Sequence, residues 1–344
     1  MQELPSVAVC IPTYNQAQYL IHSVGSACSQ TYSNVEVWVS DNASTDDTPE
    51  LMAQICQNFP QVRYHRHPQN MGMTANCNWV LSQPDTEFVI RLDSDDAMLP
   101  RYVETLVALM QKYPEVGWAH VATQEIDEYG KQSVVRRVLR KHEFQSAEEA
   151  LRASVSGLRT ASSIFMFRTK ALQEVGFYGD GHLKYSEDYD LAIRMSDAGY
   201  GNIYSDDILA EYRVWSDAEH TRPKRKGDQL KAYLWIYKKS LLPAFQKRGW
   251  DTKVIDKYRR KMALIHSAAC FSPIFTKAER EELIGLLKEL GDSPSLRLRL
   301  FALSLGLAPL FEWQHHTELK LKGFVKGWLS QFQAAFKLKK VESV

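Results

Sequence analysis

The chain of 344 residues lacks an excess of charge of either sign, because its 42 Lys and Arg residues nearly balance its 41 Asp and Glu residues. There is therefore no overall electrostatic case for nucleic acid as a partner, and none is expected. The chain also lacks a long apolar run. Its most apolar late stretch, residues 300–311, contains Pro309, and it is too short for a bilayer span, which needs ~20 residues. We expect no membrane-spanning helix, and no leader, since residues 1–5 run directly into a strand.

Cysteines are few and scattered along the chain. None stands in a C-x-x-C pair, and no histidine spacing suggests a zinc site. We therefore expect reduced core thiols in a cytosolic protein, at Cys10, Cys28, Cys56, Cys77 and Cys270.

The residues that are present indicate a globular chain with two parts, since 44% are hydrophobic and 24% are charged. In the first half, short apolar runs alternate with helical patterns, which predicts βαβ units and a mainly parallel, Rossmann-like sheet. The strands are expected at Val7–Ile11, Val35–Val39, Val62–His65 and Phe88–Leu92, and the helices at about 17–30, 48–58, 72–82 and 100–112. The later pattern is wholly helical, so we expect a catalytic α/β domain over 1–225 and a helical region over 226–344.

Polar side chains follow three of the expected strands, at the point where each strand ends. They are Pro12-Thr13-Tyr14-Asn15, Asp41-Asn42 and Asp93-Ser94-Asp95-Asp96. Ligands of parallel sheets bind beyond the carboxyl ends of the strands. The three clusters therefore predict one site along one edge of the sheet.

The acids after the fourth strand carry the sharpest chemical signal. Several carboxylates at the end of a buried strand are costly unless a positive group lies among them. A divalent cation carrying a phosphorylated ligand meets this need, since Mg²⁺ and Mn²⁺ favour carboxylate oxygens. The alternative is an acidic turn that caps a helix beginning near Pro100.

With these clusters in order, the chain resembles a family 2 glycosyltransferase of the GT-A fold. That family moves sugars from nucleotide donors with inversion of the anomeric centre. The matching residues are Val9–Asn15, Val39–Asp46, Asn70–Gly72 with Asn78, Asp93–Asp96, and Glu187 with Asp188. The likeness covers roughly residues 5–215 and leaves out the helical tail.

The resemblance implies a role for each matching residue. On the nucleotide side these are Pro12, Thr13 and Tyr14 against the base and ribose, Asp41 at the base edge, Asn70 and Gly72 where the backbone approaches the nucleotide, and Asp93 with Ser94 near the ribose. Asp95, together with Asp93, would hold the divalent cation, Mn²⁺ or Mg²⁺. Asp188 would act as the general base.

The chain departs from the family pattern in two places. Many relatives carry a metal-binding His after the last strand, whereas this chain has Trp215 there, in Tyr212-Arg-Val-Trp215. His220 is a candidate substitute, and its alternative is a solvated loop residue. The Q-x-x-R-W motif of processive polysaccharide synthases does not fit Gln246–Trp250, which predicts the addition of one sugar or very few.

The chemistry of sugar transfer explains why these residue types are needed. A cation that bridges the phosphates stabilises the leaving charge by several kcal/mol, and a carboxylate base typically contributes about 10²–10⁴-fold. Attack opposite the leaving group inverts the anomeric centre. Asp188 suits the base, because the first turn of a helix favours an ionised acid. The alternative is ordinary capping after Ser186, and Glu187 either orients the acceptor or caps the helix.

Three functions remain open from the sequence. The leading one is metal-assisted transfer from a UDP- or dTDP-sugar to a saccharide or lipid-linked acceptor, in surface polysaccharide or glycolipid assembly. A sugar-phosphate nucleotidylyltransferase is less expected, because Pro12–Gln16 lacks the Gly- and Arg-rich loop of that class. A non-catalytic nucleotide-sugar-binding or scaffolding protein is opposed by the presence of both Asp95 and Asp188.

The tail combines Lys with Trp, Phe and Leu over residues 317–340. A basic amphipathic helix of this kind either docks on neighbouring helices or lies on an anionic membrane surface. We expect a cytoplasmic protein. If the tail lies on a membrane, we expect peripheral contact at the inner face.

Overall fold

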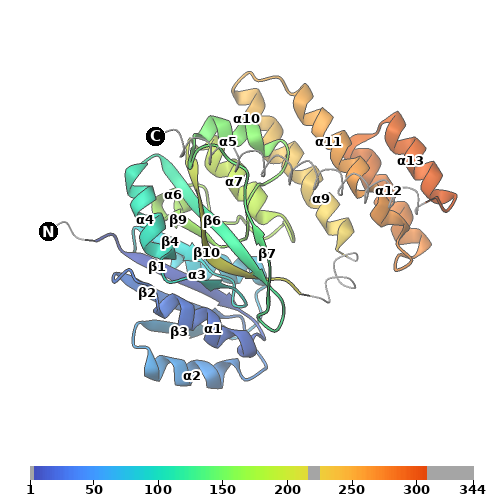
Figure 1. Ribbon diagram of the computed structural model, residues 1–344. Coiled ribbons are helices and arrows are strands. Elements are labelled where there is room, and N and C mark those ends of the chain that lie inside the picture. The colour runs from blue at the N-terminus through green and yellow to red at the C-terminus, as the bar shows by residue number, and fades with distance from the viewer. Residues whose placement is uncertain (1–3, 216–224, 308–344) are drawn as a thin grey trace, which may run out of the picture. The chain divides into compact units, whose positions relative to one another are not determined.

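The computed structural model describes residues 4–215 and 225–307, which fall into two compact units (Figure 1). The first unit ends at Tyr258 and the second begins at Arg259. Helices α9 (Lys226–Ile236) and α10 (Leu242–Lys247) thus belong to the unit that holds the sheet. The functional division expected at residue 225 stays a prediction. Across both described ranges, no helix is long and apolar enough to cross a membrane.

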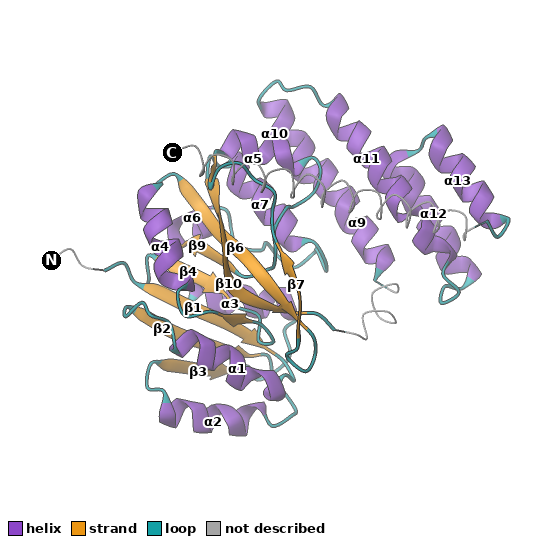
Figure 2. Ribbon diagram, viewed as in Figure 1, coloured by secondary structure: helices purple, strands orange, loops and turns teal. Residues whose placement is uncertain are grey.

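The strands of the first unit form one ten-stranded mixed sheet whose centre is mostly parallel (Figure 2). They are β1 (Val7–Thr13), β2 (Val35–Asp41), β3 (Val62–Arg66), β4 (Phe88–Arg91), β5 (Ala97–Met98), β6 (Val116–Ile126), β7 (Gln132–Arg136), β8 (Phe144–Gln145), β9 (Phe165–Arg168) and β10 (Gly201–Arg213). The strand order is β3-β2-β1-β4-β9-β6-β10-β5, with β7 paired to β6 and β8 paired to β10. Strands β3, β2, β1 and β4 run parallel, as do β6 and β10, whereas β9 runs antiparallel between β4 and β6.

Helices cover both faces of this sheet (Figure 2). They are α1 (Ala17–Cys28), α2 (Thr48–Asn58), α3 (Met73–Ser82), α4 (Tyr102–Lys112), α5 (Ala147–Ser154), α6 (Thr169–Glu174) and α7 (Glu187–Asp197). The four helices expected early in the chain are confirmed within a few residues. Helix α2 starts at Thr48 with Pro49 in its first turn, so Asp47 and not Thr48 holds the N-cap position.

The alternating side chains of β1 supply both halves of the core. Val7, Val9 and Ile11 pack with α1, α2 and α4, whereas Ala8 and Cys10 pack with α3, α6 and α7. A strand that is buried on both faces has a continuous apolar sequence, as expected of a parallel sheet between two helical layers. The prediction of an α/β fold with a mostly parallel central sheet is confirmed.

The helices that follow residue 225 belong to both units. In the first unit, α9 leads through a π-helical turn, Tyr237–Leu241, into α10. Helix α11 (Lys253–His266) spans the boundary, and the second unit continues through a 3-10 turn, Ser267–Phe271, to α12 (Lys277–Gly291) and α13 (Pro294–Ser304). Six leucines of the second unit are buried: Leu283, Leu287, Leu290, Leu296, Leu300 and Leu303. The helical pattern of this region is confirmed over its described part.

The sheet register places the three polar clusters at one edge. Thr13 at the end of β1 lies opposite Asp41 at the end of β2, and Cys10 of β1 lies opposite Arg91 at the end of β4. Because these strands run parallel, the loops that follow them leave the sheet on the same side.

Candidate active site

A buried arginine lies among the acids that follow β4. Arg91 is the last residue of β4 and is 5% exposed. Its Nε donates a hydrogen bond to Oδ1 of Asp93 over 2.9 Å, and its Nη1 donates one to Oδ1 of Asp188 over 3.1 Å. Oε1 of Glu187 lies 3.8 Å from the same Nη1 atom. One guanidinium thus joins the acids after β4 to the acids that open α7.

The role of Arg91 was not foreseen from the sequence. The stretch Phe88–Leu92 reads as an apolar strand, and the positive partner of the acids was expected to be a metal ion. The available signal was the charge itself, since an arginine inside a buried strand needs an acidic partner. The expectation therefore needs one addition: the chain supplies a positive charge of its own at this edge.

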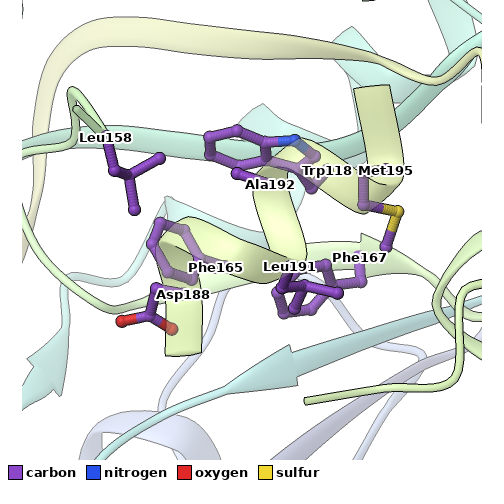
Figure 3. A pocket seen from close by; sticks show the side chains of 8 residues that line it. All are labelled: Trp118, Leu158, Phe165, Phe167, Asp188, Leu191, Ala192 and Met195. Atoms are coloured by element: carbon purple, nitrogen blue, oxygen red, sulfur yellow. The ribbon is translucent and has the colours of Figure 1, made fainter. Parts of the chain in front are cut away.

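The carboxylate of Asp188 lies at the end of a small apolar pocket. Figure 3 shows it beneath the ring of Phe165, and the rest of the lining is Trp118, Leu158, Phe167, Leu191, Ala192 and Met195. Burial raises the pKa of Asp188 to about 7, with smaller contributions from Glu187 and Asp93, while Arg91 acts to lower it. A carboxyl group with a pKa near neutrality is a better proton acceptor than an exposed one and is still ionised in part at pH 7.

The backbone at this edge is strained. Four non-glycine residues of the described chain have φ between 53° and 65°: Asn15, Ala43, Phe177 and Ser186. Such residues cost about 1–3 kcal/mol each and gather at functional sites. Asn15 and Ala43 lie in the loops after β1 and β2, and Ser186 directly precedes Glu187 and Asp188. Ser186 makes no capping hydrogen bond through its side chain, so the expectation of a capping serine is wrong.

Asp95 is held by Trp215, the residue that stands where the resembling family carries a metal-binding His. Nε1 of Trp215 donates a hydrogen bond to Oδ2 of Asp95 over 2.9 Å. Burial and the neighbouring charge of Asp93 raise the pKa of Asp95, while the Trp215 hydrogen bond and Arg213 oppose the rise. The pairing of Asp95 with Trp215 was also missed, because the two residues lie far apart in the sequence.

Arg213, at the end of β10, fixes the acidic turn from the other side. Its backbone N–H donates to Oδ1 of Asp96 over 2.8 Å, and its Nε donates to the carbonyl oxygen of Asp95 over 3.0 Å. Asp96 is buried, and within the described ranges its Oδ2 has no hydrogen-bond partner. Burial, followed by the charges of Asp95 and Asp93, raises the pKa of Asp96. The acidic turn is thus anchored to the end of β10 through Arg213.

This turn fits a cation that is held mostly by its ligand. In residues 4–215 and 225–307, no three His, Cys, Asp or Glu side chains converge as a closed metal site. Mg²⁺ is commonly held by one or two carboxylates, with phosphate and water oxygens completing its shell. Asp93 and Asp95 match such an open site, and Oδ2 of Asp96 is a buried oxygen of the same turn that has no hydrogen-bond partner in the described ranges. His220, the candidate extra ligand, lies outside the described residues.

Asp41 is more deeply buried than a free contact for a nucleotide base would be. It is 0% exposed, its Oδ1 accepts from the backbone N–H of Ser44 over 2.8 Å, and its Oδ2 accepts from the Tyr64 hydroxyl over 2.7 Å. The bond to Ser44 is a local turn in which a side chain accepts from a nearby backbone N–H. The assignment of Asp41 to the base edge stays a prediction.

The loops after β2 and β3 are tied together by amide side chains. Nδ2 of Asn42 donates to Oδ1 of Asn70 over 3.1 Å, and the N–H of Met71 donates to Oδ1 of Asn42 over 2.8 Å. Gly72 follows with φ 89°, a conformation that favours glycine, and opens α3. The loop expected to meet the nucleotide is therefore fixed in shape by neighbouring backbone and amide groups.

The remaining candidate residues lie at the same edge with different exposure. Tyr14 is 45% exposed and Pro12 is half-buried, so both offer surface to a ligand. Thr13 is buried, and its hydroxyl has no partner in the described chain. Ser94 is buried within the acidic turn. The structure thus brings the expected nucleotide, metal and base residues to one edge, and their individual roles stay predictions.

Comparison with known proteins agrees with this geometry. Residues 8–176 match the model of the family "Glycosyl transferase family 2". The chain is 27% identical over 220 residues to the putative glycosyltransferase EpsE of Bacillus subtilis, covering 63% of this chain and 76% of EpsE. It is 30% identical over 130 residues to a chondroitin synthase of Escherichia coli, which covers 38% of this chain and 19% of that enzyme. The chain thus spans about a fifth of some of its longer relatives.

Solved structures share the fold. S. aureus TarS 1–349 in complex with UDP matches with a TM-score of 0.63 and 19% identity, covering 83% of this chain and 80% of TarS. The mannosyltransferase PcManGT of Pyrobaculum calidifontis, in complex with GDP-Man and Mn²⁺, matches with a TM-score of 0.55 and 17% identity, covering 91% of this chain and 84% of PcManGT. These likenesses show the GT-A fold, and the family match places residues 8–176 of the chain in glycosyl transferase family 2.

Proposed function

We propose that the protein transfers a sugar from a nucleotide-diphosphate donor to a hydroxyl acceptor, with inversion and with help from a divalent cation. The observation that carries the proposal is the guanidinium of Arg91, which contacts both Asp93 and Asp188. It keeps the candidate base beside the acids that would face the diphosphate. The relatives TarS, with UDP and UDP-GlcNAc, and PcManGT, with GDP-Man and Mn²⁺, support a nucleotide-sugar donor and a cation.

Each carboxylate has a distinct part in this proposal. Asp188 accepts the proton of the acceptor hydroxyl as that oxygen attacks the anomeric carbon, and its pKa near neutrality suits this role. Arg91 holds the ionised carboxylate in place without taking its charge away. Asp93 and Asp95 would hold the cation, which supplies charge stabilisation to the leaving diphosphate when bound.

The setting of the reaction is also a proposal. We infer transfer of one or a few sugars from a UDP- or dTDP-linked donor to a saccharide or lipid-linked acceptor of a surface polysaccharide or glycolipid. A cytoplasmic protein with peripheral contact at the inner membrane face fits such an acceptor. The segment assigned to that contact, 317–340, lies outside the described residues. Liposome flotation of the full chain and of a chain ending near 315 tests the contact.

The donor and the cation can be identified in one experiment. A thermal-shift screen of UDP-, dTDP- and GDP-sugars, each with and without Mn²⁺, should show one donor class that stabilises the protein and stabilises it more when the cation is present. NMR of the product then reads the anomeric configuration, which should be opposite to that of the donor. Retention of configuration, or no stabilisation by any nucleotide sugar, would contradict the proposal.

A further inference from the structure

The indole of Trp215 is fixed on the candidate cation site by two contacts, and Arg213 packs beside them. Its Nε1 donates to Oδ2 of Asp95 over 2.9 Å. Its ring meets Tyr19 edge-on, with ring centres 5.1 Å apart and planes at 89°. Arg213, two residues earlier in the chain, is bonded to the acidic turn and lies 4.5 Å over the same Tyr19 ring. Trp215 is therefore part of the site rather than a loose residue beyond the last strand.

The chemistry of this contact is unfavourable for a bare cation. An indole N–H is a donor only and cannot ligate a metal ion. It also points its positive end at an oxygen that a cation would use. Both oxygens of Asp93 are engaged as well, Oδ1 by Arg91 and Oδ2 by the hydroxyl of Ser163 over 3.0 Å. Three of the four carboxylate oxygens of Asp93 and Asp95 thus already accept a hydrogen bond that a bare cation would have to displace or share.

We propose that Trp215 makes cation binding conditional on the donor, so that the ion binds tightly only together with the nucleotide's diphosphate. This inference rests on the proposed function, because it takes a nucleoside diphosphate as the second ligand. Oxygens of the diphosphate supply the coordination that Trp215 does not. Binding free energies are reciprocal, so the cation must tighten diphosphate binding by the same factor. Couplings of this kind typically amount to about 5–150-fold.

The proposal also assigns a structural consequence to Trp215. Because the indole both bonds Asp95 and packs on Tyr19, it sets the orientation of the Asp95 carboxylate before any ligand arrives. A phenylalanine would keep the packing and lose the bond, whereas a histidine would offer a ligating nitrogen. Comparing tryptophan, phenylalanine and histidine at this position therefore separates the effects of ring packing, of the hydrogen bond to Asp95 and of metal coordination.

The test is Mn²⁺ binding to the full chain, measured by the EPR signal of the free ion, with and without UDP or GDP. The wild type should bind Mn²⁺ weakly alone and at least about tenfold more tightly with the nucleotide it accepts. W215H should tighten binding of Mn²⁺ alone by about tenfold or more and reduce the dependence on nucleotide. W215F should tighten it by a few-fold, because the competing N–H is gone. W79F, a tryptophan on α3 stacked on His65, is the matched control and should behave as wild type.

Each outcome decides between the readings. If the wild type binds Mn²⁺ alone as tightly as with nucleotide, or if folded W215H and W215F both bind it as the wild type does, Trp215 has no such role. The wild-type comparison stands even if a variant does not fold. Failure of the proposed function gives a different result: no nucleoside diphosphate binds at all, with or without Mn²⁺. Tight binding of Mn²⁺ alone by a protein that still transfers sugar would overturn this inference and leave the function intact.

Discussion

Nη1 of Arg91 lies 3.1 Å from Oδ1 of Asp188, and Nε of the same guanidinium lies 2.9 Å from Oδ1 of Asp93. The buried guanidinium of Arg91 thus pairs with two acids that have different proposed roles. Asp93 would face the diphosphate, and Asp188 would accept the proton. Only the planar fork of arginine can face both at once, since lysine offers one point charge on a flexible stem.

We therefore expect R91K to fold but to lose activity. The lysine keeps a positive charge and gives up one of the two contacts, so the base is displaced. The turnover number should fall by about 100-fold, as for other small misplacements of catalytic groups, while the KM for the donor changes less. Steady-state kinetics would measure both constants. R101K, at an exposed arginine paired with Glu104, is the control and should match the wild type.

Replacing the candidate base separates chemistry from binding. D188N is nearly isosteric and cannot accept the proton, so we expect the rate of transfer to fall by about 10²–10⁴-fold. Nucleotide binding, followed by thermal shift, should be retained, because Asp188 contacts Arg91 and not the loops after β1 and β2. Normal turnover in D188N would remove Asp188 from the base role.

The raised pKa of Asp188 also predicts how stability depends on pH. Its folded pKa of about 7 lies above the ordinary value of 3.8, so between these values the folded state binds more protons than the unfolded state. The contribution of Asp188 to the free energy of unfolding is therefore fully present below about pH 4, and it is lost as the pH rises through 7. Urea unfolding at pH 5 and pH 8 should show D188N gaining stability relative to the wild type at the higher pH. An equal difference at both pH values would mean that the pKa is not raised.

Asp95 should matter for the cation more than for the nucleotide alone. In D95N, we expect the stabilising effect of Mn²⁺ on the UDP complex to disappear, because one carboxylate of an open site is lost. Binding of UDP in the presence of a chelator should stay near the wild-type level. D85N removes a charge from an exposed residue outside the acidic turn and serves as control. Thermal shift of the wild type, D95N and D85N with UDP, each in Mn²⁺ and in EDTA, would measure these effects.

The sequence allowed the parallel part of the fold to be predicted because its signals are local. The apolar runs at Val7 and Val35, and Pro49 in the first turn of a helix, act through neighbours in the chain. The resemblance then placed Asp93, Asp95 and Asp188 in one site, and the structure brings their segments to one edge. The short strand β8 was not foreseen, since its pairing with β10 depends on residues distant in the sequence.

What could not be predicted from the sequence was the set of partners around the acids. Arg91 was hidden in an apolar strand, and the bond from Trp215 to Asp95 joins residues more than a hundred positions apart. The burial of Asp41 against Tyr64 likewise depends on strand register. Such contacts follow from tertiary packing, which composition and periodicity do not encode.

The helix that carries Asp188 is held at both ends by residues that come much later in the chain. Asp190 of α7 accepts from the hydroxyl of Ser240, and Asp197 at the end of α7 pairs with Arg248. Tyr237 adds a hydrogen bond to the carbonyl of Val155, beside α5. These contacts from residues 226–248 therefore stabilise the position of α7. A shortened enzyme cut at residue 225 would keep every matching family residue and still lose the support that keeps its proton acceptor aligned.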